Sequence, residues 1–145
     1  MLLQWSEALE VGHPIIDYDH QMLINLVNEL DRAVQMGQGA EKVAQVLDRL
    51  SQDIETHFAR EEELFEQTAY PLVEKHKQHH RDIEDLVRVF QAAYEENPAS
   101  IDLNKLLKFL KEWLMKHIGK LDKGYAPYVE KTEQKTDDVQ RKGFA

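Results

Sequence analysis

Apolar residues recur at helical spacing in four stretches of the sequence, over about residues 16–36, 40–67, 71–96 and from 101 onward. Within each stretch they stand three, four or seven positions apart, which is the period of an amphipathic helix, and no stretch shows the sustained alternation of a β-strand. The predicted core stripes include Ile16, Leu23, Val27 and Leu30; Val43, Val46, Leu50 and Ile54; Leu72, Ile83, Val87 and Tyr94; and Leu106, Leu110, Trp113 and Leu114.

Glycine and proline separate these stretches. Gly37 and Gly39 break the first pattern, Pro71 is a favourable first-turn residue for the third, and Ser100 is the expected N-cap of the fourth. Four amphipathic helices joined by short loops pack as neighbours that alternate in direction. The sequence therefore predicts an all-α fold: an antiparallel up-down-up-down four-helix bundle preceded by an N-terminal arm.

The length of 145 residues fits one domain, which we expect over residues 1–131. Residues 132–145 are polar and mixed in charge, so we expect a disordered tail or a linker there. The chain contains no cysteine, which excludes disulfides and thiolate metal sites.

The formal net charge of −9 argues against nucleic acid and anionic membranes as partners, because both attract basic surfaces. No apolar run approaches the roughly 20 residues that a membrane helix needs, and the first residues lack the basic start of a signal peptide. We therefore expect a cytoplasmic protein with no nucleic acid or membrane partner. The sequence does not identify a protein partner.

Seven histidines occur in the chain, and five of them fall within the apolar stripes. Each predicted helix contributes at least one of these five: His20, His57, the pair His76 and His80, and His117. Residues four apart differ by only about 40° around a helix and share one face. His76 and His80 therefore point together, and Glu61 points together with His57.

The positions of these histidines along their helices match. Those of the first and third helices stand near helix starts, whereas those of the second and fourth stand near helix ends. In an up-down-up-down bundle all four places lie at one end. We therefore expect five imidazoles and the Glu61 carboxylate to converge there. His13, in the arm, and His79, about 100° around the helix from His80, are expected at the surface.

A single histidine in an apolar stripe is more often a hydrogen-bonded core residue than a metal ligand. An acidic run such as residues 61–66 usually faces solvent. Five imidazoles at one level are a different case, because burying them without a cation leaves several polar groups unpaired, at about 1–3 kcal/mol each. A metal site removes that cost and is the favoured interpretation.

Imidazole and carboxylate ligands without thiolate suit iron, zinc, copper or manganese. A second carboxylate candidate is Asp122, five residues after His117, but on a straight helix it points about 140° away. Asp122 joins the cluster only if the helix widens or ends between these residues, and Gly119 eases both. The set then has seven protein ligands, too many for one ion and suitable for two ions bridged by carboxylates.

The order of these motifs resembles the hemerythrin family, and bacterial hemerythrins in particular. The motifs stand here as IDYDH ending at His20, HFARE from His57 to Glu61, HKQHH from His76 to His80, and HIGKLD from His117 to Asp122. The similarity covers about residues 1–130; each motif alone is weak, but four in this order are specific. The resemblance implies two iron ions joined by an oxo or hydroxo group and bridged by Glu61 and Asp122.

The resemblance also implies that one iron keeps a position open for dioxygen. His76, His80 and His117 would hold the closed iron, and His20 and His57 the open one. By their positions next to the ligands, four residues are expected to wall the oxygen pocket: Leu23, Phe58, Trp113 and Leu114. None of the four carries an acidic proton, which favours reversible binding of dioxygen over its reduction. We therefore expect oxygen carriage, storage, delivery or sensing rather than an enzyme.

Three alternatives stay open. The same ligands would serve a di-iron oxidase, a peroxidase or a nitric-oxide-handling enzyme, although the sequence shows neither a substrate channel nor a proton donor near the open iron. The chain would also suit an oxygen or redox sensor module, with which the polar tail is compatible. The third alternative is a metal-storage or metal-free interaction bundle.

Overall fold

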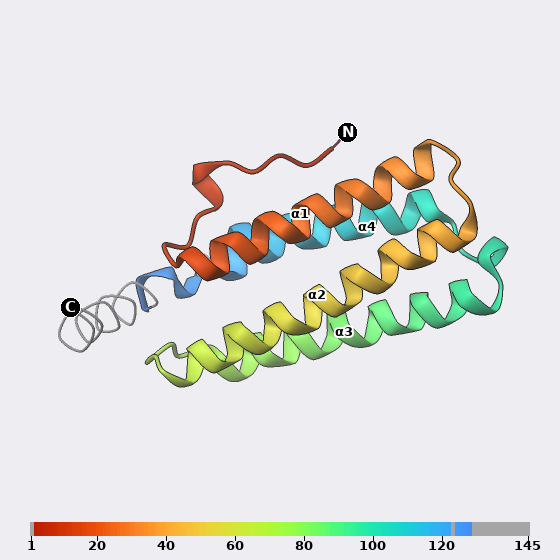
Figure 1. Cartoon of the computed structure of the whole chain (residues 1–145). Coiled ribbons are helices and arrows are strands. Elements are labelled where there is room, and N and C mark those ends of the chain that lie inside the picture. The colour runs from red at the N-terminus through yellow and green to blue at the C-terminus, as the bar shows by residue number, and fades with distance from the viewer. Residues whose placement is uncertain (1, 123, 129–145) are drawn as a thin grey trace, which may run out of the picture.

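The computed structural model describes residues 2–122 and 124–128, in which four long α-helices form the fold (Figure 1). They are α1 (Pro14–Gln35), α2 (Ala40–Glu66), α3 (Val73–Glu96) and α4 (Leu103–Lys116). Short 3₁₀ turns occur at Glu7–Leu9 and Pro98–Ser100, and a π-helical segment, His117–Asp122, continues α4. These residues contain no β-strand, so the predicted all-α class is confirmed. The predicted tail, residues 132–145, lies outside the described residues.

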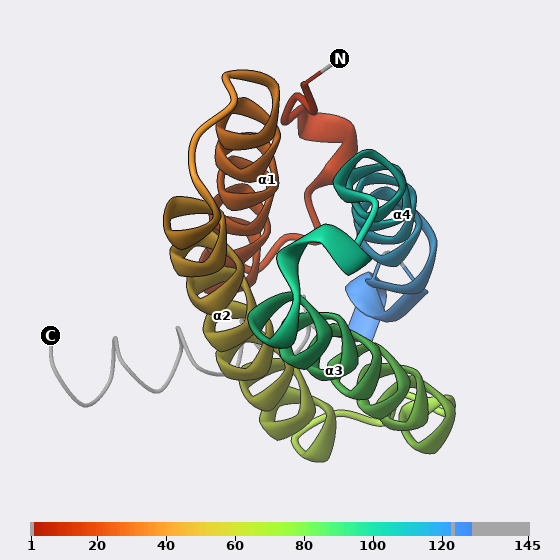
Figure 2. The ribbon, with the colours of Figure 1, turned by 90° about the vertical axis from the view of Figure 1, so that its right-hand side faces the viewer.

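Consecutive helices run in opposite directions and are joined by residues 36–39, 67–72 and 97–102 (Figure 1). α1 packs against both α2 and α4, and α2 packs against α3. Seen along the bundle, the helices surround a common interior, and the N-terminal arm runs beside α1 and α4 (Figure 2). This is the predicted up-down-up-down bundle. None of the described helices is long and apolar enough to cross a lipid bilayer.

The ends of α1 follow from its capping residues. Pro14 is the first helical residue, and the His13 ring accepts a hydrogen bond from the Ile16 N–H at 3.4 Å. At the other end, Gly37 adopts a φ of +66°, and its N–H donates to the Val34 carbonyl at 3.1 Å. Glycine adopts this φ at little cost, which is why the helix ends there.

Two predicted helix starts were wrong. α3 begins at Val73 rather than Pro71, and Leu72, predicted as a core residue, is 52% exposed because it precedes the first turn. α4 begins after Asp102, whose carboxylate accepts hydrogen bonds from two backbone N–H groups of the first turn at 3.1 and 3.2 Å. Aspartate and serine are both good N-caps, so residue type alone did not distinguish Asp102 from Ser100.

The interior contains two apolar clusters. The larger one holds the predicted stripe residues of all four helices, apart from Ile16 and Leu72. The smaller one lies where α1 begins and α2 ends, and it consists of Val11, Ile16, Leu64, Phe65, Tyr70 and Tyr125. Burying one large apolar side chain stabilises the fold by about 1.5–3 kcal/mol, so both clusters hold the helices together.

Candidate metal centre

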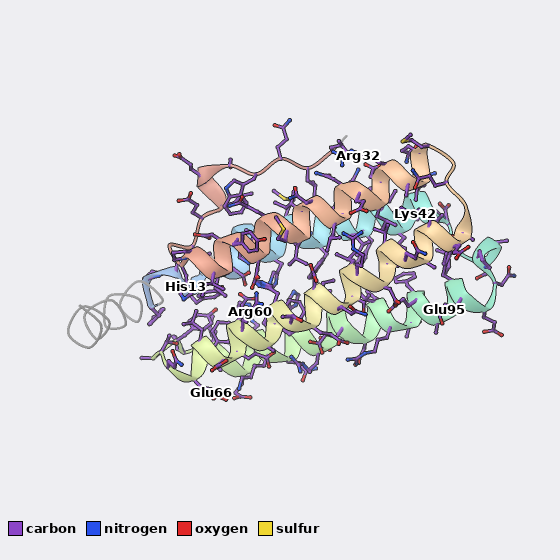
Figure 3. The ribbon with its side chains drawn as sticks, in the orientation of Figure 1. His13, Arg32, Lys42, Arg60, Glu66 and Glu95 are labelled. Carbon is purple, nitrogen blue, oxygen red and sulfur yellow. The ribbon has the colours of Figure 1, made fainter. Side chains whose placement is uncertain are left out.

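The seven side chains predicted as ligands meet at the end of the bundle where α1 and α3 begin. Figure 3 labels His13 and Arg60 toward this end, and Lys42 and Glu95 toward the other. Every one of the seven is at most 2% exposed: His20, His57, Glu61, His76, His80, His117 and Asp122. We call these seven residues the metal cluster.

The donor atoms of the metal cluster form two overlapping groups, each with its atoms within 4.8 Å of one another. One group is His20, His57, Glu61, His117 and Asp122; the other is Glu61, His76, His80 and His117. Two neighbouring cations that share ligands need such an overlap. The groups separate His20 and His57 from His76 and His80, as in the predicted division. His117 belongs to both groups, so the groups do not assign it to either cation.

Asp122 reaches the cluster through the π-helical segment His117–Asp122. Hydrogen bonds of a π-helix span five residues, so residues five apart share a face. Oδ2 of Asp122 lies 2.7 Å from His20 Nε2 and 3.0 Å from His117 Nε2, and Oδ1 lies 3.0 Å from His76 Nε2. The predicted distortion is therefore present, and the Asp122 carboxylate stands between His20 and His76.

Glu61 lies one turn after His57 on α2 and points with it, as the spacing predicted. Its Oε1 lies 2.8 Å from His57 Nε2 and 3.4 Å from the Nε2 atoms of His80 and His117. Its Oε2 accepts a hydrogen bond from the Tyr125 hydroxyl at 2.5 Å. Glu61 thus borders both groups of donors. Tyr125 was not predicted, although its place three residues after Asp122 was a signal for it.

Unpartnered polar atoms concentrate in the metal cluster. Among the described residues, ten buried side-chain nitrogen and oxygen atoms lack a hydrogen-bond partner, and nine of them belong to the cluster. His20 Nε2 and Asp122 Oδ2, for example, approach to 2.7 Å without the geometry of a hydrogen bond. Each such atom costs about 1–3 kcal/mol, which coordination of a cation removes. The donor set of imidazoles and carboxylates fits iron.

The charges of the cluster shift its protonation equilibria. Burial acts to lower the pKa of His117, but Asp122 and Glu61 raise it to about 9. Burial acts to raise the pKa of Asp122, but the neighbouring histidines, His117 first, hold it well below its usual range. The carboxylate is therefore ionised at neutral pH. A cation must displace the His117 proton, so metal binding releases protons.

Comparison with known proteins supports the same conclusion. Residues 11–129 match the family model described as the hemerythrin HHE cation binding domain. The chain belongs to the hemerythrin family. It is 33% identical over 128 residues to the bacteriohemerythrin of Stenotrophomonas maltophilia, and the alignment covers 88% of this chain and 82% of that protein. It is 31% identical over 123 residues to the myohemerythrin of Theromyzon tessulatum, and this alignment covers 84% of this chain and 89% of that protein.

A solved structure has the same fold. The crystal structure of a wild-type hemerythrin aligns with a TM-score of 0.80 at 25% identity, covering 90% of this chain and 99% of that chain. The predicted resemblance to the hemerythrin family and the four-helix bundle are thereby confirmed.

A carboxylate behind His57 was not predicted. His57 Nδ1 lies 3.1 Å from Asp19 Oδ2, and the other oxygen of Asp19 accepts a hydrogen bond from Arg60. A carboxylate in this position fixes the tautomer and orientation of an imidazole, so that its Nε2 faces a metal. Asp19 directly precedes His20, and this adjacency was the signal that the sequence offered.

A second carboxylate stands behind His80, a histidine of the other group of donors. His80 Nδ1 lies 3.3 Å from Glu62 Oε2, which also accepts a hydrogen bond from Arg81. Glu62 belongs to the acidic run that usually faces solvent, yet its side chain is 18% exposed. Each proposed half of the cluster therefore has one histidine backed by a carboxylate and an arginine.

The four residues predicted to wall an oxygen pocket are all buried. Phe58 stacks on the His80 ring with 3.8 Å between ring centroids, and Trp113 stacks on the His117 ring with 5.5 Å between ring centroids. Leu114 is fully buried, and Leu23 lines a cavity of about 250 Å³ beside Asp19 and Arg60. Two of the four thus contact imidazoles that we predicted on the closed iron. Their role as an oxygen pocket stays a prediction.

The two remaining histidines belong to neither group of donors. His13 caps α1 and is half-buried. His79 is also half-buried; its ring lies nearly parallel to that of His117 at 6.2 Å, and burial lowers its pKa. Both were predicted outside the metal cluster, although neither is fully exposed.

Proposed function

We propose that this chain is a non-haem di-iron protein that binds dioxygen reversibly and does not act as an enzyme. The observation that carries the proposal is the set of nine unpartnered buried donor atoms in the metal cluster of a hemerythrin-family chain. Seven ligands are too many for one ion and suit two. Two ferrous ions there would supply the two electrons that reversible binding of dioxygen requires.

In this proposal His76, His80 and His117 hold one iron, and His20 and His57 hold the other. Glu61 and Asp122 would be the ligands that both irons share. The support for bridging is that the two oxygens of Asp122 border different histidines, His20 at 2.7 Å and His76 at 3.0 Å. Glu61 likewise borders His57 at 2.8 Å and His80 at 3.4 Å.

The chain's own residues favour release of oxygen over its reduction. Of the four proposed wall residues, three are hydrocarbons, and the indole N–H of Trp113 is too weak an acid to supply a proton. The Tyr125 hydroxyl is bonded to Glu61, and its ring packs on His76 at 5.7 Å, on the side of the proposed closed iron. Complete burial of the cluster also excludes bulk water.

The test is a cycle of oxygenation. The protein is loaded with ferrous iron without oxygen, exposed to air and then freed of oxygen, while visible absorbance and iron per chain are measured. We expect two irons per chain and a charge-transfer band that appears with oxygen and disappears without it over several cycles. Immediate conversion to a stable oxidised form with release of hydrogen peroxide would indicate an oxidase. Zinc-loaded protein is the control without a band.

A sensor module is the second candidate, because the N-terminal arm contacts the π-helical segment. The turn Glu7–Leu9 packs against His117–Asp122. Two hydrogen bonds of 2.8 Å between the Leu3 backbone and the Asn28 side chain also fix the arm on α1. A shift of Asp122 on oxygen binding would therefore reach the arm. Limited proteolysis with and without oxygen tests this candidate, and equal cleavage of the arm contradicts it.

A further inference from the structure

The metal cluster is closed to solvent. All seven of its side chains are at most 2% exposed, and the aromatic rings of Phe58, Phe65 and Trp113 pack against its histidines. Protein interiors are packed as densely as organic crystals, and an unpaired charge inside them is costly. A ferrous ion therefore does not pass through the apolar core, and the proposed function requires a route from solvent to the cluster.

One cavity reaches the edge of the metal cluster. It has a volume of about 300 Å³ and lies where the connection 67–72 leads into α3 (Figure 1). Its wall combines exposed side chains, such as Leu72 and Lys75, with His76 of the metal cluster. Three other cavities of the described residues have no cluster member in their walls. This cavity therefore brings solvent next to a proposed iron ligand.

The same wall carries two donors outside the metal cluster, His79 and Asp82. They stand three residues apart on α3 and so share a face, and imidazole and carboxylate both suit ferrous iron. Asp82 Oδ1 accepts a hydrogen bond from Gln78 at 2.9 Å, which leaves Oδ2 for a cation. Among the described residues, neither donor belongs to a group of three or more close donors. A cation therefore binds here weakly and can move on.

The step inward is short. The His79 ring lies nearly parallel to the ring of the cluster residue His117, with 6.2 Å between ring centroids. Both ring nitrogens of His76 are buried and without a hydrogen-bond partner, unlike the two histidines that are backed by carboxylates. No hydrogen bond therefore holds the His76 ring, which can tilt toward the cavity. Its Nε2 lies 3.0 Å from Oδ1 of Asp122, a proposed shared ligand.

We propose that ferrous iron enters the metal cluster through this cavity, where His79 and Asp82 bind the ion first and His76 takes it inward. The proposal rests on the di-iron function proposed above and gives His79, which belongs to neither group of donors, a role in metal loading. Nothing is oxidised or reduced in this step, because the ion only exchanges bound water for protein ligands. The ammonium group of Lys75 in the same wall repels the ion and slows its entry.

The test measures how fast folded, metal-free protein takes up iron. The protein is mixed with ferrous iron without oxygen, samples are quenched with excess EDTA and desalted, and iron per chain is followed over time. We expect His79→Ala and Asp82→Asn to reach the iron content of the wild type several-fold more slowly, because neither residue belongs to the metal cluster. His13→Ala and Asp85→Asn are the controls; both residues lie outside the cavity wall, and both variants should load at the wild-type rate.

Two further variants separate the charge of the cavity wall from its space. Lys75→Gln removes a positive charge and should speed loading several-fold, whereas Leu72→Trp enlarges a side chain that is 52% exposed and should slow it. In about 1 M potassium chloride the Debye length falls to about 3 Å. There the rates of Lys75→Gln and Asp82→Asn should approach that of the wild type, while Leu72→Trp stays slow. A general loss of stability does not produce opposite effects of this kind.

The outcomes distinguish the route from the proposed function. A wild type that holds no iron, whether loaded when folded or during refolding, overturns both. Two irons loaded at equal rates in the wild type, His79→Ala and Asp82→Asn overturn the route alone. Iron uptake only when the wild type is unfolded in urea and refolded with iron also overturns the route, because the ion then binds before the helices close. Slower loading by Lys75→Gln overturns the role of the wall charges.

Discussion

The Nδ1 atom of His57 lies 3.1 Å from the Oδ2 atom of Asp19, on the side of the ring that faces away from the metal cluster. With the proton of the ring on Nδ1, the lone pair of Nε2 faces Glu61, whose Oε1 is 2.8 Å away. Asp19 is itself held by Arg60. The half-exposed Arg60 side chain is thus linked, through the buried Asp19, to the orientation of a proposed ligand.

Replacing Asp19 by Asn should weaken metal binding, because the amide cannot hold the His57 N–H as a carboxylate does. Loss of such a contact costs about 10–100-fold in metal affinity. Affinity is measured by competition with a chelator, on protein whose helix content is unchanged. Asp53→Asn is the matched control, since Asp53 is exposed and lines the same cavity as Asp19. Equal affinity of the two variants would show that the contact does not support the metal.

Replacing His57 by Ala should remove the iron of the proposed open site first, because only His20 then remains as a histidine ligand there. Elemental analysis and Mössbauer spectroscopy of the reconstituted protein should show one iron lost per chain and no oxygen-dependent band. His13→Ala keeps the metal cluster intact and serves as the control. Full iron content and oxygen binding in His57→Ala would refute the ligand assignment.

Replacing Leu114 by Ala should speed autoxidation, because the space left in the wall of the oxygen pocket admits water. Leu107→Ala is the matched control on the same helix, since the two leucines are 0% and 3% exposed and Leu107 lies nearer the start of α4. Each variant should lose about 2–5 kcal/mol of unfolding free energy. Only Leu114→Ala should shorten the lifetime of the oxygenated band, and equal lifetimes count against its pocket role.

Stability should fall in acid through Asp31, which lies far from the metal cluster. Its Oδ2 is 2.6 Å from Lys111 Nζ, and this hydrogen bond lowers the pKa of Asp31. A lowered carboxyl pKa stabilises the fold above the unfolded value of about 3.9, and this stability is lost as pH falls through the folded pKa.

Asp31→Asn should therefore cost about 1–2 kcal/mol at pH 7 and progressively less in acid. Urea unfolding of the metal-free wild type and variant, at pH 7 and in acid, measures the difference in unfolding free energy. A difference that does not shrink in acid would mean that the ion pair is not its source.

Most of the metal cluster could be predicted because its members sit on regular helices. His57 and Glu61 are four apart on α2, as are His76 and His80 on α3, and a period of 3.6 residues puts each pair on one face. Asp122 could not be derived this way, because the period itself changes to that of a π-helix after His117. Gly119 was predicted to ease this change of helix geometry. It does not do so by avoiding a steric clash, since a Cβ there would meet no atom within 4 Å.

The sequence by itself determined the four helices, their alternating directions and the level at which five histidines meet. It did so because hydrophobic periodicity and short connections act locally along the chain. Only the tertiary structure decided that the Asp122 carboxylate turns inward, that Asp19 and Glu62 stand behind His57 and His80, and that Tyr125 bonds to Glu61. These contacts join residues whose meeting depends on how the helices pack against one another and on where α4 widens, and neither follows from a repeat in the sequence.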